Sequence, residues 1–351
     1  MRPGLQASCS GRIDRADKDL ITRLDNRLDQ LVNIDKGERG VEHLFEAARS
    51  LQGGSLVGAA ADALMAVPEG GTVIVTTGSV SRAWITPELG ENDGPSGAAA
   101  VARALVLARN ATCVMLCEES LLPAIRSTCQ AAGLFPVSLE QAAIARADKS
   151  LATIVMLPYA TEDEAGQAQA TLMLDDLQPD LMFSTERVGR NEYGVYHSMR
   201  GIDYGMGRAR VDFLFDEALS RGIPVVAVGD GGNEIGMGKV SDHVKAHVPY
   251  GGTCQCGCGG GIGAVSSCDV LVTAACSNWG CTAISAAVAA RAGNAKLLHT
   301  PDREALLLDT MVASGLINST HGIVDDSVDG FPRQSHLAVA ELCRTIVSRA
   351  L

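Results

Sequence analysis

Six short apolar segments, separated by helix-like segments, constrain the fold of this 351-residue chain more than any other feature. Near-continuous apolar strands of this kind are buried on both faces, and the intervening helices provide the crossovers that parallel strands need. The pattern predicts an α/β fold, with a mostly parallel sheet and helices on both faces in a Rossmann-like three-layer arrangement. The expected strands are 72–77, 111–117, 152–158, 180–184, 223–229 and 268–275.

The two ends of this pattern are less regular. Residues 295–300 are a candidate seventh strand, and 134–138 a weaker extra one. Before the first strand, apolar residues recur at helical spacing. They are Ile13, Leu20, Leu24, Leu28 and Leu31. We therefore expect a helical segment over 1–70 that packs on an α/β domain over 71–351.

Charge and hydropathy exclude several classes of function. The net charge of −12 and pI near 5 argue against nucleic acid or an anionic membrane surface as the main partner. No apolar run approaches the roughly 20 residues of a membrane span, and the N-terminus lacks the apolar core of a secretory signal. We expect a cytoplasmic protein, or a mitochondrial matrix protein in a eukaryote. The sequence does not determine the oligomeric state, and a homodimer is one possibility.

Unusual polar motifs follow the carboxyl ends of the expected strands, the edge at which open α/β sheets bind ligands. The segment 226–238, VAVGDGGNEIGMG, lacks the third glycine of a dinucleotide fingerprint because Glu234 stands in its place. Asp230, Asn233 and Glu234 are oxygen ligands suited to Mg²⁺, Mn²⁺ or Ca²⁺. The alternative is a glycine-rich turn whose Asp230 caps the next helix.

Two other motifs carry candidate substrate contacts. In ENDGPSG (91–97), Ser96, Gly97 and the following helix N-terminus could hold a carboxylate or phosphate, while Asp93 is also a candidate helix cap. Three arginines share the loop after strand 180–184 and could clamp a substrate carboxylate, or be solvated charges. They are Arg187, Arg190 and Arg200. His197 in the same loop is a candidate acid or base.

The chain has eleven cysteines, three of them in TCQCGCGGG as Cys254, Cys256 and Cys258. Without a secretory signal, free thiols are favoured over a disulfide framework. Single-residue spacing is compatible with a soft metal but differs from the paired C-x2-C of common zinc sites. We favour a reduced glycine-rich loop.

Four motifs, in this order, resemble the C-terminal domain of the D-glutamate cyclase family. They are ENDGPSGAAAVARAL, ERVGRNEYGVYHSMRG, VGDGGNEIGMG and SNWG. The resemblance runs from about residue 21 to the C-terminus, and it does not extend to the hydro-lyase-like N-terminal domain of the vertebrate enzyme. It implies an α/β fold, a divalent cation, and conversion of D-glutamate to 5-oxo-D-proline and water. The site residues that it implies are Glu91, Asp93, Glu186, Asp230, Asn233 and Glu234.

From this resemblance we expect a metal-dependent lyase acting on a small acidic metabolite. Asp93, Glu186 and the 230–234 motif are expected to hold the cation. Glu91 or Glu118 is the expected base, with Arg187 or Arg200 on the α-carboxylate. Ser277 and Asn278 of SNWG, together with Ser96, Gly97 and Arg190, are expected substrate contacts. Two alternatives remain, a metal-dependent phosphohydrolase on the same acidic site and a non-catalytic metal- or metabolite-binding protein.

Overall fold

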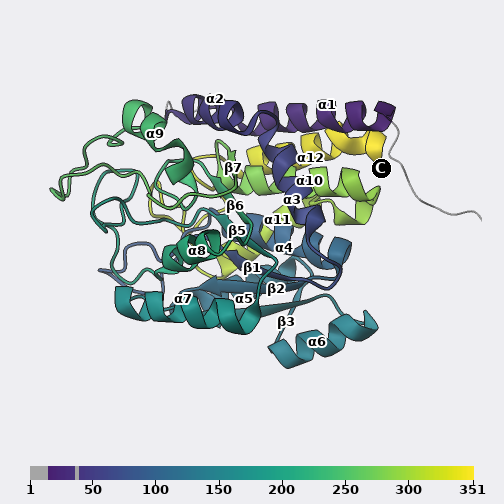
Figure 1. The fold of residues 1–351 in the computed structure, drawn as a ribbon, viewed down its shortest axis with the longest axis horizontal. Coiled ribbons are helices and arrows are strands. Elements are labelled where there is room, and N and C mark those ends of the chain that lie inside the picture. The colour runs from purple at the N-terminus through teal and green to yellow at the C-terminus, as the bar shows by residue number, and fades with distance from the viewer. Residues whose placement is uncertain (1–14, 36–38) are drawn as a thin grey trace, which may run out of the picture.

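Seven strands form one sheet in the order β3-β4-β2-β1-β5-β6-β7 (Figure 1). The computed structural model describes residues 15–35 and 39–351. The strands are β1 (Thr72–Thr76), β2 (Thr112–Cys117), β3 (Phe135–Val137), β4 (Thr153–Pro158), β5 (Leu181–Thr185), β6 (Val225–Gly229) and β7 (Val270–Thr273). Every neighbouring pair is parallel, and each of the six expected segments coincides with a strand to within two residues at either end. The predicted α/β fold is confirmed.

The seventh strand is the weaker candidate rather than the stronger one. β3 lies within 134–138 and pairs with β4 at the edge of the sheet. The prediction of a strand at 295–300 is wrong, because Ala295–Leu297 forms a short 3-10 helix, η3. The side chain of Asn294 caps this helix by accepting the backbone N–H of Lys296. This apolar segment packs against α4 and α10, so its burial comes from helix contacts and not from strand pairing.

Twelve α-helices are described, and they cover both faces of the sheet (Figure 1). They are α1 (Arg15–Val32), α2 (Val41–Gln52), α3 (Leu56–Ala66), α4 (Pro95–Arg109), α5 (Leu122–Ala131), α6 (Leu139–Asp148), α7 (Asp163–Leu177), α8 (Val211–Ser220), α9 (Ser241–His247), α10 (Ser277–Ala292), α11 (Pro301–Ala313) and α12 (Arg333–Val347). Over the described residues, none of these helices has both the length and the apolar character needed to cross a bilayer.

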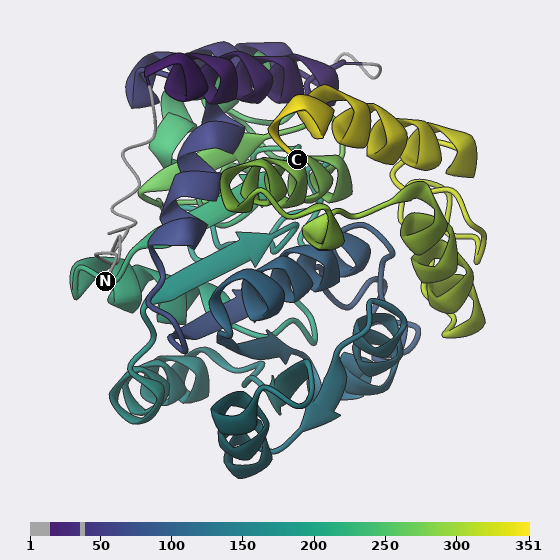
Figure 2. The same ribbon diagram turned by 90° about the vertical axis from the view of Figure 1, so that its right-hand side faces the viewer.

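The strand order places a topological switch point between β1 and β5. From β1 the chain moves outward through β2 to β3, and after β4 it crosses to β5, β6 and β7 on the other side of β1. Right-handed crossovers in opposite directions put their helices on opposite faces. Accordingly, α4 packs with α10 on one face and α7 packs with α8 on the other (Figure 2). Ligands of open α/β sheets bind at the carboxyl ends of the strands that flank such a switch point.

Of the N-terminal helices, α2 and α3 pack against β7, an edge strand of the sheet. Leu24 and Leu28 of α1 are buried, as their spacing predicts, whereas Ile13 lies outside the described residues. The carboxylate of Asp29 accepts the backbone N–H groups of Leu56 and Val57 and so caps α3. The backbone N–H of Ala275 donates to the carbonyl of Val32, joining α1 to the end of β7. This contact brings the segment after α1 to the carboxyl edge of the sheet.

Close packing of α4 on α10 depends on Gly97. A Cβ at this position would lie 2.8 Å from the Cβ of Cys281 and 3.0 Å from Oδ1 of Asn278. Because neither neighbour is the far end of a flexible side chain, a methyl group there would push the helices apart. Gly97, expected to bind substrate, therefore serves helix packing.

We expect Gly97→Ala to destabilise the protein by about 1–3 kcal/mol, because overpacking outweighs the better helix propensity of alanine. Urea denaturation would measure the loss. Gly54→Ala is the matched control, since a Cβ at Gly54 meets nothing within 4 Å. Equal stabilities for the two variants would contradict the close α4–α10 contact.

Candidate active site

A cavity of about 300 Å³ opens at the carboxyl edge of the sheet, beside the switch point. Its walls come from the segments after β1, β5 and β6 and from the loops before α2 and α12. The carboxylates that line it are those of Glu91, Glu186, Asp230 and Asp329. The guanidinium groups that line it are those of Arg39, Arg82, Arg200 and Arg208. A small cavity with both charges on its walls is suited to a small charged ligand.

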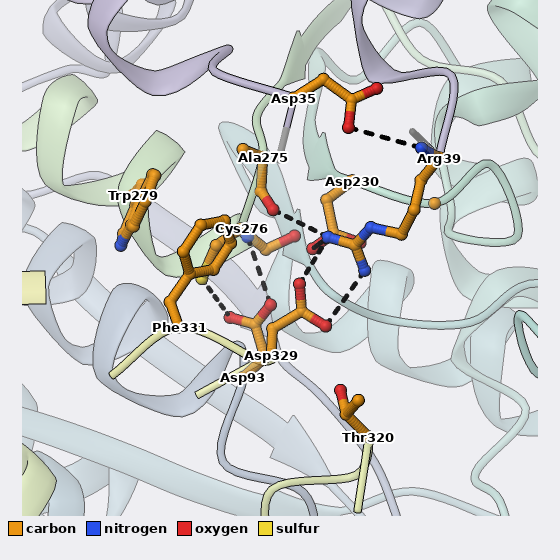
Figure 3. A network of polar contacts seen from close by, with 12 residues as sticks. Asp35, Arg39, Asp93, Asp230, Ala275, Cys276, Trp279, Thr320, Asp329 and Phe331 are labelled. Atoms are coloured by element: carbon orange, nitrogen blue, oxygen red, sulfur yellow. Dashed lines mark hydrogen bonds and ion pairs between the residues drawn. The ribbon is translucent and has the colours of Figure 1, made fainter. Parts of the chain in front are cut away.

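Three carboxylates and one arginine meet at the inner end of this cavity (Figure 3). Ligand oxygens of Asp93, Asp230 and Asp329 lie within 4.8 Å of one another. The guanidinium of Arg39 donates to Asp329 at 2.5 Å and to the carbonyl of Ala275 at 2.8 Å, and it lies 3.5 Å from Asp230. Arg39 therefore neutralises part of the acidic cluster from a loop on the N-terminal side of the chain.

Two helix N-termini, capped reciprocally, position Asp93. Its carboxylate accepts the backbone N–H groups of Ser277 and Asn278 at the start of α10. In return, Oδ1 of Asn278 accepts the backbone N–H groups of Gly94 and Gly97 at the start of α4. Asp93 thus caps α10, not the helix that directly follows it. The partial positive charge of both N-termini favours an anion at this point.

The glycine-rich loop after β6 is organised by Glu234. One carboxylate oxygen accepts the backbone N–H groups of Asp230 and Gly231, and the other accepts that of Gly232. Gly232 has a φ of 102°, which allows the chain to turn around this carboxylate. Glu234 is therefore occupied in holding the loop, whereas the carboxylate of Asp230 contacts only Arg39 among the described residues.

Burial and mutual repulsion perturb the acidic groups. The pKa of Glu186 is held well above its ordinary value of 4.5, first by burial and then by the charges of Asp93 and Glu234. Burial and the charge of Glu186 likewise raise the pKa of Asp230. The pKa of Asp93 is raised to about 7 by burial and by Asp329. A cation among these groups would offset the repulsion.

The donor set fits a hard divalent cation. Two overlapping groups of carboxylates each have ligand oxygens within 4.8 Å of one another, and Asp230 belongs to both. One group adds Asp93 and Asp329, and the other adds Glu186 and Glu234. All donors are oxygens, as Mg²⁺, Mn²⁺ and Ca²⁺ prefer. Asn233 also lines the cavity, and its amide nitrogen donates to the carbonyl of His197.

Two residues expected to act in catalysis form a buried ion pair instead. Arg187 donates to both oxygens of Glu118, at 3.0 and 2.7 Å, and neither side chain lines the cavity. Glu118 also accepts the backbone N–H of Ala209, and these contacts hold its pKa below the ordinary value against the effect of burial. A fully paired carboxylate of lowered pKa is a poor base. The structure assigns this pair to holding loop 186–209 in place.

Three more expected substrate contacts lie elsewhere. Arg190 pairs with Asp212 and Asp216 of α8 and is not part of the cavity wall. Ser96 is buried in the first turn of α4, away from the wall. Ser277 donates to a carboxylate oxygen of Glu186 at 2.6 Å and so orients a group that does line the cavity.

Arg208, which the sequence analysis did not single out, is the arginine best placed for a ligand. It is 2% exposed, lines the cavity and lies over the ring of Tyr204 at 4.3 Å. Its Nε has no hydrogen-bond partner among the described residues. An unpaired guanidinium N–H is costly to bury, so a bound carboxylate would satisfy it. Arg200 is also on the wall and donates to the carbonyl of Thr320.

Residues with left-handed backbone conformation line the same cavity. Among the described residues, seven non-glycine residues have positive φ, and Arg82, Glu186 and Asp329 of the cavity wall are three of them. Asn110, Lys149 and Gln178 end helices, where a left-handed residue is ordinary. Asp329 and Gly330 form a two-residue turn between Val328 and Phe331, where positive φ is ordinary for Asp, but neither a helix end nor such a turn accounts for Glu186. Strain of this kind persists where the surroundings hold a side chain in position for function.

The fold and cavity define an α/β protein with an oxygen-rich, arginine-lined site at the switch point of its sheet. The chain belongs to the family described as "D-glutamate cyclase-like, C-terminal", which matches residues 28–343. One curated relative is the human protein named "D-glutamate cyclase, mitochondrial", 26% identical over 349 residues. That match covers 91% of this chain and 51% of the human protein, so the chain spans about half the relative's length.

We expect Arg187→Met to lower the free energy of unfolding by about 3–5 kcal/mol, because it leaves Glu118 charged and buried without a partner. The double variant Arg187→Met/Glu118→Leu should recover most of this loss. Arg221→Met, which breaks an exposed ion pair, is the control and should change stability little. Denaturant titrations measure all three, and a single variant as stable as the wild type would rule out the buried pair.

The raised pKa of Glu186 predicts that the metal-free protein loses stability as pH rises. A carboxyl whose pKa is higher in the folded state favours its protonated form there, so its contribution is lost above the unfolded value near 4.5. Between pH 5 and 8 in EDTA, Glu186→Gln should lose less stability than the wild type, because it carries no carboxyl that must ionise in the buried site. Thermal and urea melts test this, and parallel pH curves would contradict it.

Proposed function

We propose that this protein converts D-glutamate to 5-oxo-D-proline and water with the help of a divalent cation. Family membership supports the reaction, and the observation that carries the proposal is the cavity with carboxylates and guanidinium groups on its walls. The relative named a D-glutamate cyclase is matched over half its length, so the activity of this chain is an inference. We place the activity in the cytoplasm, or in the mitochondrial matrix of a eukaryote.

The charges of the cavity complement those of D-glutamate, which carries two carboxylates and one ammonium group. Arg208 is buried with an unpaired Nε, and it is the best candidate to hold one carboxylate. Arg200 and Arg82 lie on the same wall and could contact the other. The ammonium would lie toward Glu91, a carboxylate that lines the same cavity and whose charge acts on Arg208.

The reaction forms a bond between the amine nitrogen and the γ-carbon and breaks one C–O bond of the γ-carboxylate. Two protons leave the ammonium and depart with the displaced oxygen as water. Holding the extended substrate in a bent form provides much of the acceleration, because the attack is intramolecular. Burial raises the pKa of Glu91, so once deprotonated it accepts a proton readily. We assign Glu91 as the base.

A cation would be held by Asp230, with Asp329 and Asp93 on one side or Glu186 on the other. Bound there, Mg²⁺, Mn²⁺ or Ca²⁺ supplies Lewis acidity that polarises the γ-carboxylate. Arg39 contacts both Asp230 and Asp329, so cation binding and the position of this arginine are coupled.

A phosphohydrolase is less well supported. In that alternative, the N-terminus of α4 would hold phosphate through its backbone N–H groups. Gly94 and Gly97 already donate theirs to Oδ1 of Asn278, which leaves this end of the helix capped by protein. Non-catalytic binding remains as an outcome of the assay.

The test is an assay of D-glutamate with Mg²⁺, Mn²⁺ or Ca²⁺, followed by chiral chromatography of 5-oxo-D-proline. We expect cation-dependent product that EDTA abolishes. Asp230→Asn should lower kcat about a hundredfold or more, since it weakens electrostatic stabilisation of the transition state. Arg208→Lys should raise KM at least about tenfold, because lysine cannot make two parallel hydrogen bonds to a carboxylate.

Asp175→Asn is the matched control for Asp230→Asn, because Asp175 is an exposed carboxylate of α7. Its activity should equal that of the wild type. Cation and D-glutamate binding without product would favour a binding protein, and turnover of a generic phosphate ester would favour a hydrolase. Either result would replace the cyclase proposal.

A further inference from the structure

Three thiols and one imidazole converge beside the cavity, outside the acidic site. Ligand atoms of His197, Cys254, Cys256 and Cys258 all lie within 4.8 Å of one another. The Sγ of Cys254 is 3.3 Å from that of Cys256 and 3.4 Å from that of Cys258. Nε2 of His197 is 3.2 Å from Sγ of Cys256 and 3.8 Å from Sγ of Cys258.

This convergence requires the chain to fold back on itself. In an extended strand, alternate residues lie roughly 6.6 Å apart, too far for their thiols to touch. Here Gly257 and Gly259 adopt φ values of 81° and 93°, and the backbone N–H of Cys254 donates to the carbonyl of Gly260 at 2.8 Å. The loop is thus closed around the thiols. The sulfur–sulfur distances are far longer than the roughly 2.05 Å of a disulfide.

A hydrogen-bond donor contacts one of the thiols, and the imidazole lies within contact distance of two of them. Nδ2 of Asn191 donates to Sγ of Cys258 at 3.4 Å and to the carbonyl of Gly261 at 2.9 Å. An N–H donor of this kind stabilises a charged sulfur ligand. His197 is fully buried, and its Nδ1 has no hydrogen-bond partner among the described residues. The polar contacts of its ring are therefore those of Nε2 with the thiols.

We infer that His197, Cys254, Cys256 and Cys258 form a zinc site. Three thiolates and one imidazole are a common ligand set of structural zinc, and hard cations such as Mg²⁺ do not select it. With zinc–ligand distances of about 2.0–2.3 Å, tetrahedral geometry places ligand atoms roughly 3.5–3.8 Å apart. The four distances, from 3.2 to 3.8 Å, need shifts of only a few tenths of an ångström. Exposed Cys256 provides a path of entry.

The site would be structural rather than catalytic, because four protein ligands leave no open position on the metal. Its role follows from its neighbours in the chain. Ser198, Met199 and Arg200, directly after His197, line the cavity. The carbonyl of His197 accepts a hydrogen bond from Asn233 of the loop after β6. Zinc at this point ties loop 251–261 to the segment that forms one wall of the cavity.

Single-residue spacing of cysteines is not the usual zinc signature, so the sequence alone favours a reduced loop. The fourth ligand, His197, lies 57 residues before Cys254 and was considered only as an acid or base. Spacing alone could not join them. The pairing becomes visible only once the loop after β5 and the loop after α9 lie side by side.

The first experiment measures metal in the full chain, purified with a phosphine reductant and without chelators. Elemental analysis should find one zinc per chain. After zinc removal under reducing conditions, Co²⁺ titration should give visible bands of tetrahedral cobalt and a near-ultraviolet thiolate charge-transfer band, saturating at one equivalent. Absence of both zinc and the thiolate–cobalt spectrum would overturn the inference, whatever the activity of the protein.

Variants then assign the ligands. Cys256→Ser and His197→Ala should each lower zinc affinity by more than about a hundredfold, since losing a ligand costs more than losing a residue that supports one. Cys129→Ala, a buried thiol of α5, is the matched control and should retain one zinc. Asp230→Asn should also retain zinc, which separates this site from the acidic one. Full zinc content in Cys256→Ser, with circular dichroism confirming its fold, would refute the assignment.

Discussion

Asp93 and Asn278 exchange hydrogen bonds between two helix N-termini, and the geometry of the acidic site depends on this exchange. Each side chain satisfies backbone N–H groups of the other's helix, so α4 and α10 begin at the same point in space. The close contact at Gly97 is possible only with that arrangement. Because α4 follows β1 and α10 follows β7, the capping pair joins the central strand to the sheet edge and sets the inner end of the cavity.

The same arrangement concentrates negative charge that the protein only partly balances. Arg39 and Arg208 face Glu91, Asp93, Glu186, Asp230 and Asp329. Burial and repulsion raise the pKa of four of these carboxyls, so the folded chain stores free energy that a bound cation would release. Such a site is unfavourable for stability alone. Its cost is explained if the carboxylates are kept for binding and chemistry.

The strands, and the site residues that directly follow them, could be predicted because each depends on a local pattern in the sequence. Each strand is a contiguous apolar run, and the parallel topology then places Glu91, Glu186 and Asp230 at one edge. Arg39 and Asp329 escaped prediction because they lie between helices, and tertiary packing alone brings them to the site. The sequence suggests Arg187 as a substrate contact because it shares a loop with Arg190 and Arg200, and nothing in that loop distinguishes a buried arginine from one that faces a ligand. Its burial against Glu118, 69 residues away, is not a local property.

The loop between β5 and α8 contributes residues to the acidic group, to the thiol cluster and to the cavity wall. It begins with strained Glu186 at the acidic group, passes His197 at the thiol cluster and ends near Arg208 at the cavity wall. The buried Arg187–Glu118 pair holds the start of the loop, and Glu118 also accepts the N–H of Ala209 near its end. Between these ends, Arg190 pairs with Asp212 and the carbonyl of His197 accepts a hydrogen bond from Asn233, so Ser198–Ile202 would lose less conformational entropy on binding a ligand. Zinc bound at His197, as inferred above, would add one more fixed point next to the cavity wall and would order this wall before a ligand binds.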